Sequence, residues 1–383
     1  MKNKFIKFLP AALFIAFTLS LGIAFFALPK KDFSDYEKRY LAETPIFSLS
    51  NLLSGDLVKE IDGDSENGTT GYVSDHFPFR SFFVGLNSYY NLSFGNTANS
   101  DYYFGEDGFI ITKPYNIRRL DTNIKVLNSF SEDMNVTLGV VPSAGYILED
   151  KLPQNHISYK DAEVYEKLKA ELSDDINYCD LEAVMKEFYS SGEAPYYKTD
   201  HHWTTPAAYS AYKELGNILG YTHAEKSEFN IKEYGGFYGT TYSSSGYFLA
   251  KPDTLEIWEN RKLKDSITVE IHEGEKLESY SSMYFENHLT EPDMYPVFLD
   301  GNHALVRIKN ENAEGGKLLV IKDSYAHALV PFMAENYSEI VMIDMRYFKE
   351  NVTALCEGEG ITDALILYSV SNFCTDTDLA FLE

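Results

Sequence analysis

Short apolar runs recur along the second half of this chain, separated by polar segments that are long enough to form helices. They occupy residues 317–322, 339–344 and 363–368, and a similar run lies earlier, at residues 135–142. A nearly continuous apolar run is typical of a strand that is buried on both faces, as in a parallel sheet. The pattern therefore predicts an α/β fold with a mainly parallel sheet and helices on its faces.

The segments between these runs have helical spacing. Apolar residues three or four positions apart mark two helical faces, at Leu120, Ile124, Leu127 and Phe130 and at Val164, Leu168 and Leu172. Residues 326–336 also have a helical pattern, although Pro331 requires this helix to bend or to start late. Residues 224–316 differ, because glycine and serine clusters interrupt β-prone runs such as 266–272. We expect a β-rich or irregular insertion there.

The N-terminal region contains the longest apolar stretch. Residues 8–28 have no charged side chain, and as a helix their length matches the hydrocarbon core of a bilayer. Lys2, Lys4 and Lys7 precede the stretch, which places the N-terminus in the cytoplasm and the remaining chain outside. A signal peptide is the alternative, but residues 24–29 are too bulky for a small-residue cleavage site. We expect an uncleaved, single-pass membrane anchor.

These patterns divide the chain into three parts. Residues 1–29 form the cytoplasmic tip and the anchor, and residues 30–110 form an extension that packs on the main domain. Residues 111–383 form the main domain, with the insertion at about 224–316. Polar turn residues at 62–70 predict a flexible insertion within the extension.

Composition and charge narrow the class of partner. The chain has 383 residues, 44% of them hydrophobic, which is enough for a sizeable core. Its formal charge of -25 argues against nucleic acid, whose phosphates would be repelled. The odd number of cysteines, Cys179, Cys356 and Cys374, excludes a disulfide framework, although one bridge between the last two is conceivable.

The candidate chemistry begins with Asp200, His201, His202 and Trp203, which stand just before a predicted helix. Thr205 and Pro206 have the residue types of an N-cap and a first helical position. Loops that lead into helices often carry functional groups. The run is therefore a candidate for acid and base chemistry at a helix N-terminus.

Ser324 supplies a candidate nucleophile. It follows Asp323 at the end of the run 317–322, where a strand gives way to a helix, which is a common setting for a nucleophilic serine. A serine needs a base to accept its proton and a third group to orient that base. Two residues apart on an extended loop, Asp200 and His202 would point the same way and supply both.

A metal site is the competing use of Asp200, His201 and His202. Zinc hydrolases commonly space two histidines four residues apart on a helix, and adjacent histidines on a loop do not easily reach one ion. We therefore predict no metal and no cofactor. His201 is expected to support the loop from outside, and Trp203 to fix it by packing.

Further candidates lie beyond the predicted strand ends. Asn372 follows the run 363–368 on the edge where parallel sheets bind ligands, so its amide is a candidate oxyanion donor. Arg346 follows the run 339–344 on the same edge, and Tyr325 adjoins the serine. Both are candidate substrate contacts, and an ordinary structural role is the alternative for each.

The run Asp200–Trp203 resembles the signature of the DHHW family, and the wider pattern resembles the alginate O-acetyltransferase group of SGNH-hydrolase-like proteins. Three more segments resemble N-terminal features of that family, at residues 36–45, 72–80 and 105–109. The resemblance implies a three-layer SGNH-like fold in which an Asp-x-His pair precedes the serine. It also implies that Asp200 orients His202, that His202 is the base, and that Ser324 accepts the acyl group.

Three functions follow from this resemblance. The first is an extracytoplasmic O-acetyltransferase that modifies a cell-surface polysaccharide and receives acetyl groups from a membrane-bound O-acyltransferase partner. The second is a carbohydrate acetyl esterase that uses the same three residues, with water as the acceptor. The third is a non-catalytic glycan-binding or assembly protein. It is suggested by Lys322, which stands where the related enzymes usually have glycine.

Overall fold

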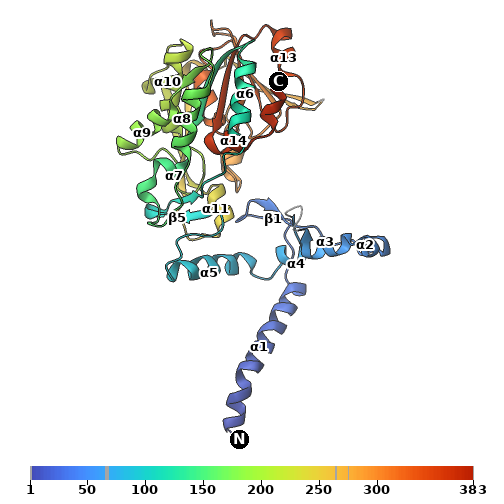
Figure 1. Cartoon of the computed structure of the whole chain (residues 1–383). Coiled ribbons are helices and arrows are strands. Elements are labelled where there is room, and N and C mark those ends of the chain that lie inside the picture. The colour runs from blue at the N-terminus through green and yellow to red at the C-terminus, as the bar shows by residue number, and fades with distance from the viewer. Residues whose placement is uncertain (1, 65–68, 264, 275, 383) are drawn as a thin grey trace. The chain divides into compact units, whose positions relative to one another are not determined.

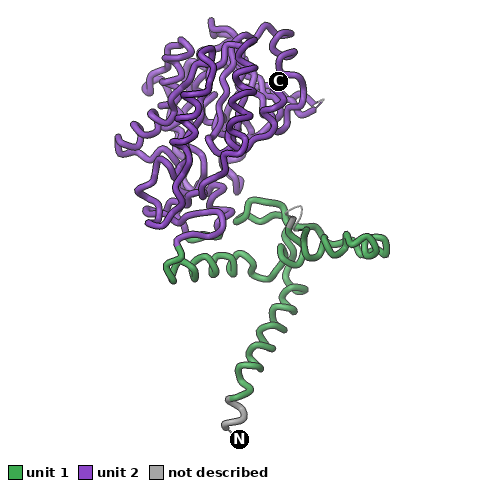
Figure 2. The backbone as a smooth tube through the Cα atoms, in the orientation of Figure 1, with its two compact units in different colours: residues 1–96, 246–249 green, residues 97–245, 250–383 purple. Residues whose placement is uncertain are grey.

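The computed structural model describes residues 2–64, 69–263, 265–274 and 276–382. The chain forms two compact units, which Figure 2 distinguishes by colour. Unit 1 comprises Met1–Asn96 and Gly246–Leu249, and unit 2 comprises Thr97–Ser245 and Ala250–Glu383. The predicted flexible insertion at 62–70 lies partly outside the described residues, and its residues 63–64 and 69–70 pair as a short hairpin.

Unit 1 is built from helices and two short hairpins (Figure 1). Its helices are α1 (Lys2–Ala27), α2 (Leu49–Ser54), α3 (Asp56–Asp62), α4 (Tyr72–Asp75) and α5 (Arg80–Ser93). The hairpins pair β1 (Phe33–Ser34) with β2 (Arg39–Tyr40) and β3 (Gly63–Asp64) with β4 (Thr69–Thr70). Within α1, residues Lys7–Ala27 form a 21-residue stretch with a mean hydropathy of 2.2. This apolar N-terminal helix is long enough to be a membrane anchor or a signal sequence.

Unit 2 contains an eight-stranded sheet among the described residues, in the order β12-β11-β13-β15-β14-β16-β7-β8. Its strands are β7 (Asn135–Val141), β8 (Asn177–Cys179), β11 (Ile267–Glu273), β12 (Lys276–Tyr280), β13 (Leu305–Asn310), β14 (Lys317–Lys322), β15 (Glu339–Ile343) and β16 (Asp363–Ser369). From β15 to β8 every neighbouring pair is parallel. The mainly parallel sheet predicted from the apolar runs is confirmed.

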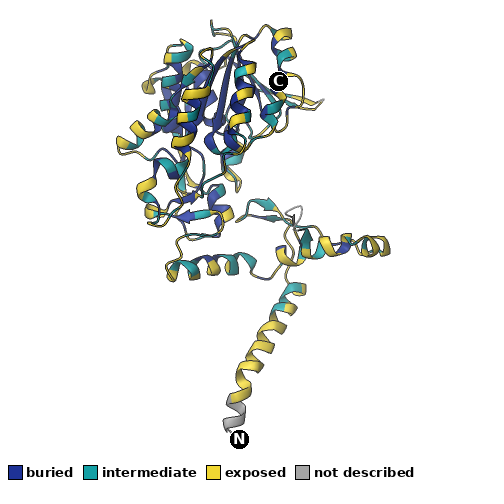
Figure 3. Ribbon diagram, in the orientation of Figure 1, coloured by how far each residue is buried: buried dark blue, intermediate teal, exposed yellow. Residues whose placement is uncertain are grey.

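Helices cover both faces of this sheet. Side chains alternate along β14, so that Leu318 and Val320 belong to one apolar core while Leu319 and Ile321 belong to the other. The first core includes α9 (Leu181–Ser190), α10 (Thr205–Leu219) and α12 (Ala326–Met333). The second includes α6 (Leu120–Phe130), α8 (Asp161–Glu171), α13 (Val352–Glu359) and α14 (Val370–Thr375). The result is the predicted three-layer fold, with the strands coloured as buried in Figure 3.

The β-rich insertion is also confirmed, and three of its strands belong to the main sheet. Strands β11, β12 and β13 extend the sheet through antiparallel pairs, the last of them with β15. A separate hairpin pairs β9 (Phe229–Phe237) with β10 (Asp253–Asn260), and the short helix α11 (Thr240–Ser245) lies between them in the chain. The remaining strands and α-helix of unit 2 are the hairpin of β5 (Tyr102–Phe104) with β6 (Ile110–Thr112) and the single turn α7 (Ala144–Ile147), and short 3-10 turns link the elements.

Candidate active site

The turn after β14 presents Ser324 at the carboxyl edge of the parallel strands. Asp323 anchors this turn, because its carboxylate accepts hydrogen bonds from the Tyr325 amide at 3.0 Å and the Ser369 amide at 2.8 Å. The Asn372 side chain donates to the same carboxylate at 2.8 Å. Asp323 therefore joins the start of α12 to the end of β16, and Ser324 itself stays half-buried.

The Asp-His-His-Trp loop is held against this turn. Trp203 is fully buried, and its indole Nε1 donates to the Tyr325 carbonyl at 3.0 Å. The Thr204 side chain caps the following helix, α10, by accepting from the Ala207 amide. The prediction of Thr205 as the cap is therefore one residue late, because Thr205 is already helical and its hydroxyl donates to the Glu256 carbonyl instead.

Asp200, His202 and Ser324 form a continuous chain of hydrogen bonds. His202 Nδ1 lies 2.5 Å from Asp200 Oδ1, and His202 Nε2 lies 2.7 Å from Ser324 Oγ. With Asp200 ionised, Nδ1–H donates to the carboxylate and Nε2 accepts the serine proton. Asp200 and His202 are both buried, which keeps water away from the bond that joins them.

Further donors keep Asp200 ionised. The Thr240 amide donates to Oδ2 at 2.7 Å, and the Thr240 hydroxyl donates to the same oxygen at 3.0 Å. Burial alone would raise the pKa of the Asp200 carboxyl, but the neighbouring imidazoles of His202 and His201, together with the hydrogen bonds from His202 and the Thr240 amide, outweigh burial and hold that pKa well below its usual range. Gly239 permits this approach, because a Cβ atom there would lie 2.1 Å from Asp200 Cβ.

Tyr295 covers one face of the His202 ring. The two rings are stacked, with centroids 3.7 Å apart and planes 8° apart, and the Tyr295 hydroxyl donates to the Ser324 carbonyl at 3.3 Å. Tyr295, Gly239 and Thr240 were not predicted from the sequence. All three come from the insertion, and their local sequence carries no motif that would mark them.

His201 supports the same carboxylate indirectly. Its Nδ1 lies 2.6 Å from the Thr240 hydroxyl, which itself donates to Asp200. The potential ligand atoms of Asp200, His201 and His202 lie within 4.8 Å of one another, which is compatible with a metal site. However, His202 uses both of its nitrogens in the hydrogen bonds to Asp200 and Ser324, so a metal ion would have to break that chain. The geometry fits acid and base chemistry better.

Lys322 does not disturb the serine. Its ammonium is buried and contacts His327 Nε2 at 2.8 Å and Asp344 Oδ2 at 3.1 Å. Burial and then the charge of Lys322 hold the pKa of His327 well below its usual range, so the neutral ring accepts this hydrogen bond. Lys322 thus ties the first turn of α12 to the end of β15, while Ser324 Oγ still reaches His202.

The remaining candidates are engaged in other contacts. The Arg346 guanidinium binds the Asp344 carboxylate at 2.6 and 2.8 Å. The Tyr325 hydroxyl donates to the His201 carbonyl. Asn372 donates one amide hydrogen to Asp323, and among the described residues no acceptor is found for the other. Arg346 follows β15 and Asn372 follows β16, the two strands that pair with β14 on either side, so both residues lie at the carboxyl edge expected from the sequence.

Two solved structures resemble this architecture, and a third likeness is weaker. A DHHW family protein from Eubacterium siraeum has 24% identity and a TM-score of 0.61, over 72% of this chain and 92% of its own. PatB1 from Bacillus cereus, solved with a sulfonyl adduct, has 19% identity and a TM-score of 0.64, over 74% of this chain and 99% of its own. The O-acetyltransferase domain of AlgJ from Pseudomonas putida has 12% identity and a TM-score of 0.46, over 74% of this chain and 95% of its own.

The similarity to these solved structures supports the fold only. The family is shown by a match of the sequence to a family model. No curated protein matches the chain. Residues 122–343 match the family described as DHHW protein, and this range covers more than half of the chain and includes Asp200, His202 and Ser324. The chain therefore belongs to the DHHW family.

Proposed function

We propose that this protein is a membrane-anchored, extracytoplasmic O-acetyltransferase that modifies a cell-surface polysaccharide through an acetyl-Ser324 intermediate. The observation that carries the proposal is the hydrogen-bond chain from Asp200 through His202 to Ser324. Such a series of hydrogen bonds makes a serine hydroxyl nucleophilic, because the histidine can accept the hydroxyl proton.

In the first step, Ser324 Oγ attacks the carbonyl carbon of an acetyl donor while His202 Nε2 takes the hydroxyl proton. Asp200 remains ionised, and its carboxylate stabilises the imidazolium by accepting a hydrogen bond from Nδ1–H. The bond to the donor's leaving group breaks, the leaving group takes the proton from His202, and an acetyl ester remains on Ser324. The free amide hydrogen of Asn372 is a candidate donor to the transient oxyanion.

In the second step, a sugar hydroxyl takes the place of the leaving group. His202 removes the hydroxyl proton, the sugar oxygen attacks the acetyl-Ser324 carbonyl, and the ester bond to the serine breaks. Ser324 regains its proton from His202, so atoms and charges balance over the cycle. Water in place of the sugar would give hydrolysis by the same residues, which makes the exclusion of water the difference between transferase and esterase.

The proposed membrane-anchored, extracytoplasmic location is supported by helix α1 and by the lysines near the N-terminus. Its 21-residue apolar stretch is long enough to span a bilayer, and the lysines that precede it favour a cytoplasmic N-terminus. An acetyl donor made in the cytoplasm would have to be delivered across that bilayer. A membrane-bound O-acyltransferase is the proposed partner for this delivery, as the family resemblance implies.

Cells that produce this protein provide the test. O-acetyl esters on the surface polysaccharide are measured in cells with the natural chain, with Ser324→Ala and with Ser371→Ala, a serine on the same sheet edge that lies outside the hydrogen-bond chain. We expect the esters to disappear only with Ser324→Ala, at equal protein levels. Unchanged esters in that variant would refute the proposal, and esters that increase in that variant would identify an esterase instead.

A further inference from the structure

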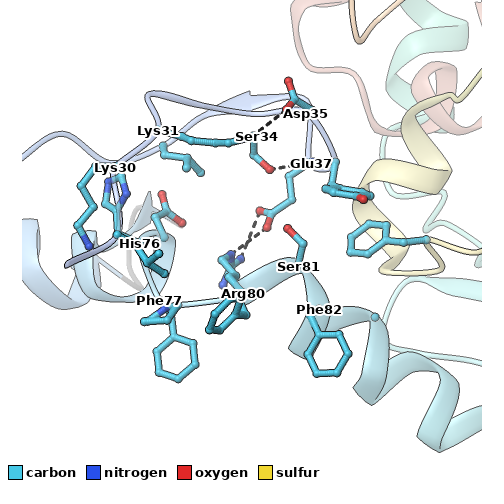
Figure 4. A pocket seen from close by; sticks show the side chains of 18 of the residues that line it. Lys30, Lys31, Ser34, Asp35, Glu37, His76, Phe77, Arg80, Ser81 and Phe82 are labelled. Atoms are coloured by element: carbon cyan, nitrogen blue, oxygen red, sulfur yellow. Dashed lines mark hydrogen bonds and ion pairs between the residues drawn. The ribbon is translucent and has the colours of Figure 1, made fainter. Parts of the chain in front are cut away.

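Unit 1 contains a hollow of about 760 Å³ that lies outside the site described above (Figure 4). Its wall is formed by the last turn of α1, the residues that follow this helix, the start of α5 and residues 248–249. This volume falls in the range of sites that bind small molecules. The hollow is therefore large enough for a ligand or for part of a long one.

The wall of this hollow is mainly apolar. The apolar side chains in the wall include Leu28, Phe33, Phe77, Phe82, Leu86 and Phe248. Most charged groups in the wall are already paired, since Arg80 donates to Glu37 at 2.8 Å and Lys31 lies 3.2 Å from Asp35. A sugar would find few free hydrogen-bonding groups here, whereas a hydrocarbon chain would lose no hydrogen bond on entry.

Lys30 is the exception among these charges. Its ammonium lies 3.7 Å from the centroid of the Phe25 ring and donates to the Phe25 carbonyl. In the part of the chain that the structure describes, no carboxylate lies within ion-pair distance of Lys30. An apolar hollow with one uncompensated cation beside it suits an amphipathic ligand that has a hydrocarbon tail and an anionic head.

The position of the hollow identifies the source of such a ligand. Ala24 and Leu28, at the end of the apolar helix α1, form part of its wall, and none of the residues in the apolar stretch of α1 is buried. If α1 spans a bilayer, the hollow is continuous with the lipid-facing surface of this helix and lies at the level of the headgroups. We propose that it binds one acyl chain of an anionic phospholipid, with the phosphate beside Lys30. This inference rests on the proposed membrane anchoring.

Native mass spectrometry of the full chain, released from detergent micelles after addition of phosphatidylglycerol or phosphatidylcholine, tests the proposal. We expect one retained phospholipid per chain and a preference for phosphatidylglycerol. Ser81→Trp, which places a large ring in the hollow, should abolish retention. Lys30→Glu should weaken retention of phosphatidylglycerol about fivefold, while phosphatidylcholine is little affected.

Asn87→Trp is the matched control, because Asn87 is exposed on the same helix, α5, and lies outside the wall of the hollow. Equal lipid retention by Ser81→Trp and Asn87→Trp, or no retained lipid on an intact chain, would overturn the proposal. The same spectrum gives the mass of the protein. A chain that lacks its N-terminal residues would contradict the anchor, and this outcome is distinct from an intact chain without lipid.

Discussion

At the residue scale, the orientation of His202 is fixed from three sides. Asp200 holds one nitrogen, Ser324 occupies the other, and the Tyr295 ring lies flat against the imidazole. A ring held in this way has little freedom to turn away from the serine proton. Because small displacements of a catalytic group reduce rates strongly, Tyr295 is expected to act as a positioning residue.

Two substitutions at Tyr295 separate its ring from its hydroxyl. Tyr295→Phe keeps the stacking and loses only the donor to the Ser324 carbonyl, so we expect kcat for an acetyl ester to stay within about threefold of the natural value. Tyr295→Ala frees the His202 ring, and we expect kcat to fall by about a hundredfold while KM changes little. Similar kcat values for Tyr295→Ala and the natural chain would contradict this role.

Lys322 is expected to stabilise the fold beneath the serine. Lys322→Met keeps the length of the side chain but leaves His327 Nε2 without its donor and Asp344 with one cation fewer. We expect a loss of about 3 kcal/mol in the free energy of unfolding, measured by thermal or denaturant melts. Lys309→Met removes a half-exposed pair with Glu270 and should cost less than about 1 kcal/mol. Equal losses for the two variants would contradict this role.

At the element scale, the parallel strands could be predicted from the sequence, whereas parts of the candidate site could not. The apolar runs at 317–322, 339–344 and 363–368 match β14, β15 and β16 almost residue for residue, because strands buried on both faces have little room for polar residues. The Asp-x-His pair and the serine were also found by local signals. Tyr295 and Thr240 were not, because their roles depend on how the insertion folds back on the loop.

Two segments that resemble family features, 36–45 and 72–80, meet in unit 1. The Arg39 guanidinium binds the buried Asp75 carboxylate at 2.6 and 2.9 Å, and Arg80 binds Glu37. Ion pairs that link segments far apart in sequence explain why both segments carry charged residues at these positions. The network joins the hairpin of β1 and β2 to α4 and α5.

This network predicts a pH dependence for unit 1. Burial alone would raise the pKa of the Asp75 carboxyl, but Arg39, the Ala42 amide and the Thr70 hydroxyl outweigh burial and lower that pKa to about 2. A lowered pKa stabilises the fold fully above the ordinary value of 3.8, and this stabilisation is lost as the pH falls towards 2. Asp75→Asn should therefore cost about 2 kcal/mol at pH 7 and progressively less below pH 4.

Hydrogen exchange of the α4 amides, compared between the natural chain, Asp75→Asn and Asp56→Asn, measures this effect. Asp56 is exposed on α3, so its substitution should change the free energy of opening by less than about 0.5 kcal/mol. A cost for Asp75→Asn that is the same at pH 3 and at pH 7 would contradict the assignment.

At the scale of the whole molecule, a strongly acidic chain carries its candidate chemistry in unit 2 and its apolar N-terminal helix in unit 1. The net charge of -25 argues against a nucleic-acid partner, whose phosphates would be repelled. The apolar N-terminal helix and the argument against nucleic acid both follow from hydropathy and composition alone. The antiparallel extension of the sheet by the insertion was not predictable in the same way, since edge pairing depends on long-range contacts.

The proposed membrane anchoring through α1 makes a prediction of its own. After an alkaline wash, the natural chain should remain in the membrane pellet with its N-terminus intact, because about 21 apolar residues make insertion effectively irreversible. A chain whose residues 1–29 are replaced by a cleavable signal peptide should move to the soluble fraction. A shortened natural chain in the culture medium would show instead that α1 is a signal sequence.

The most direct test of the proposed chemistry is peptide mass spectrometry of the full chain after brief exposure to an activated acetyl ester. We predict an acetyl group on Ser324 of the natural chain, strongly reduced labelling in His202→Ala, and none at this site in Ser324→Ala. Ser371→Ala, on the same sheet edge, should label like the natural chain. A natural chain that stays unmodified at Ser324 and does not turn over the ester would contradict the proposed function and favour a non-catalytic glycan-binding protein.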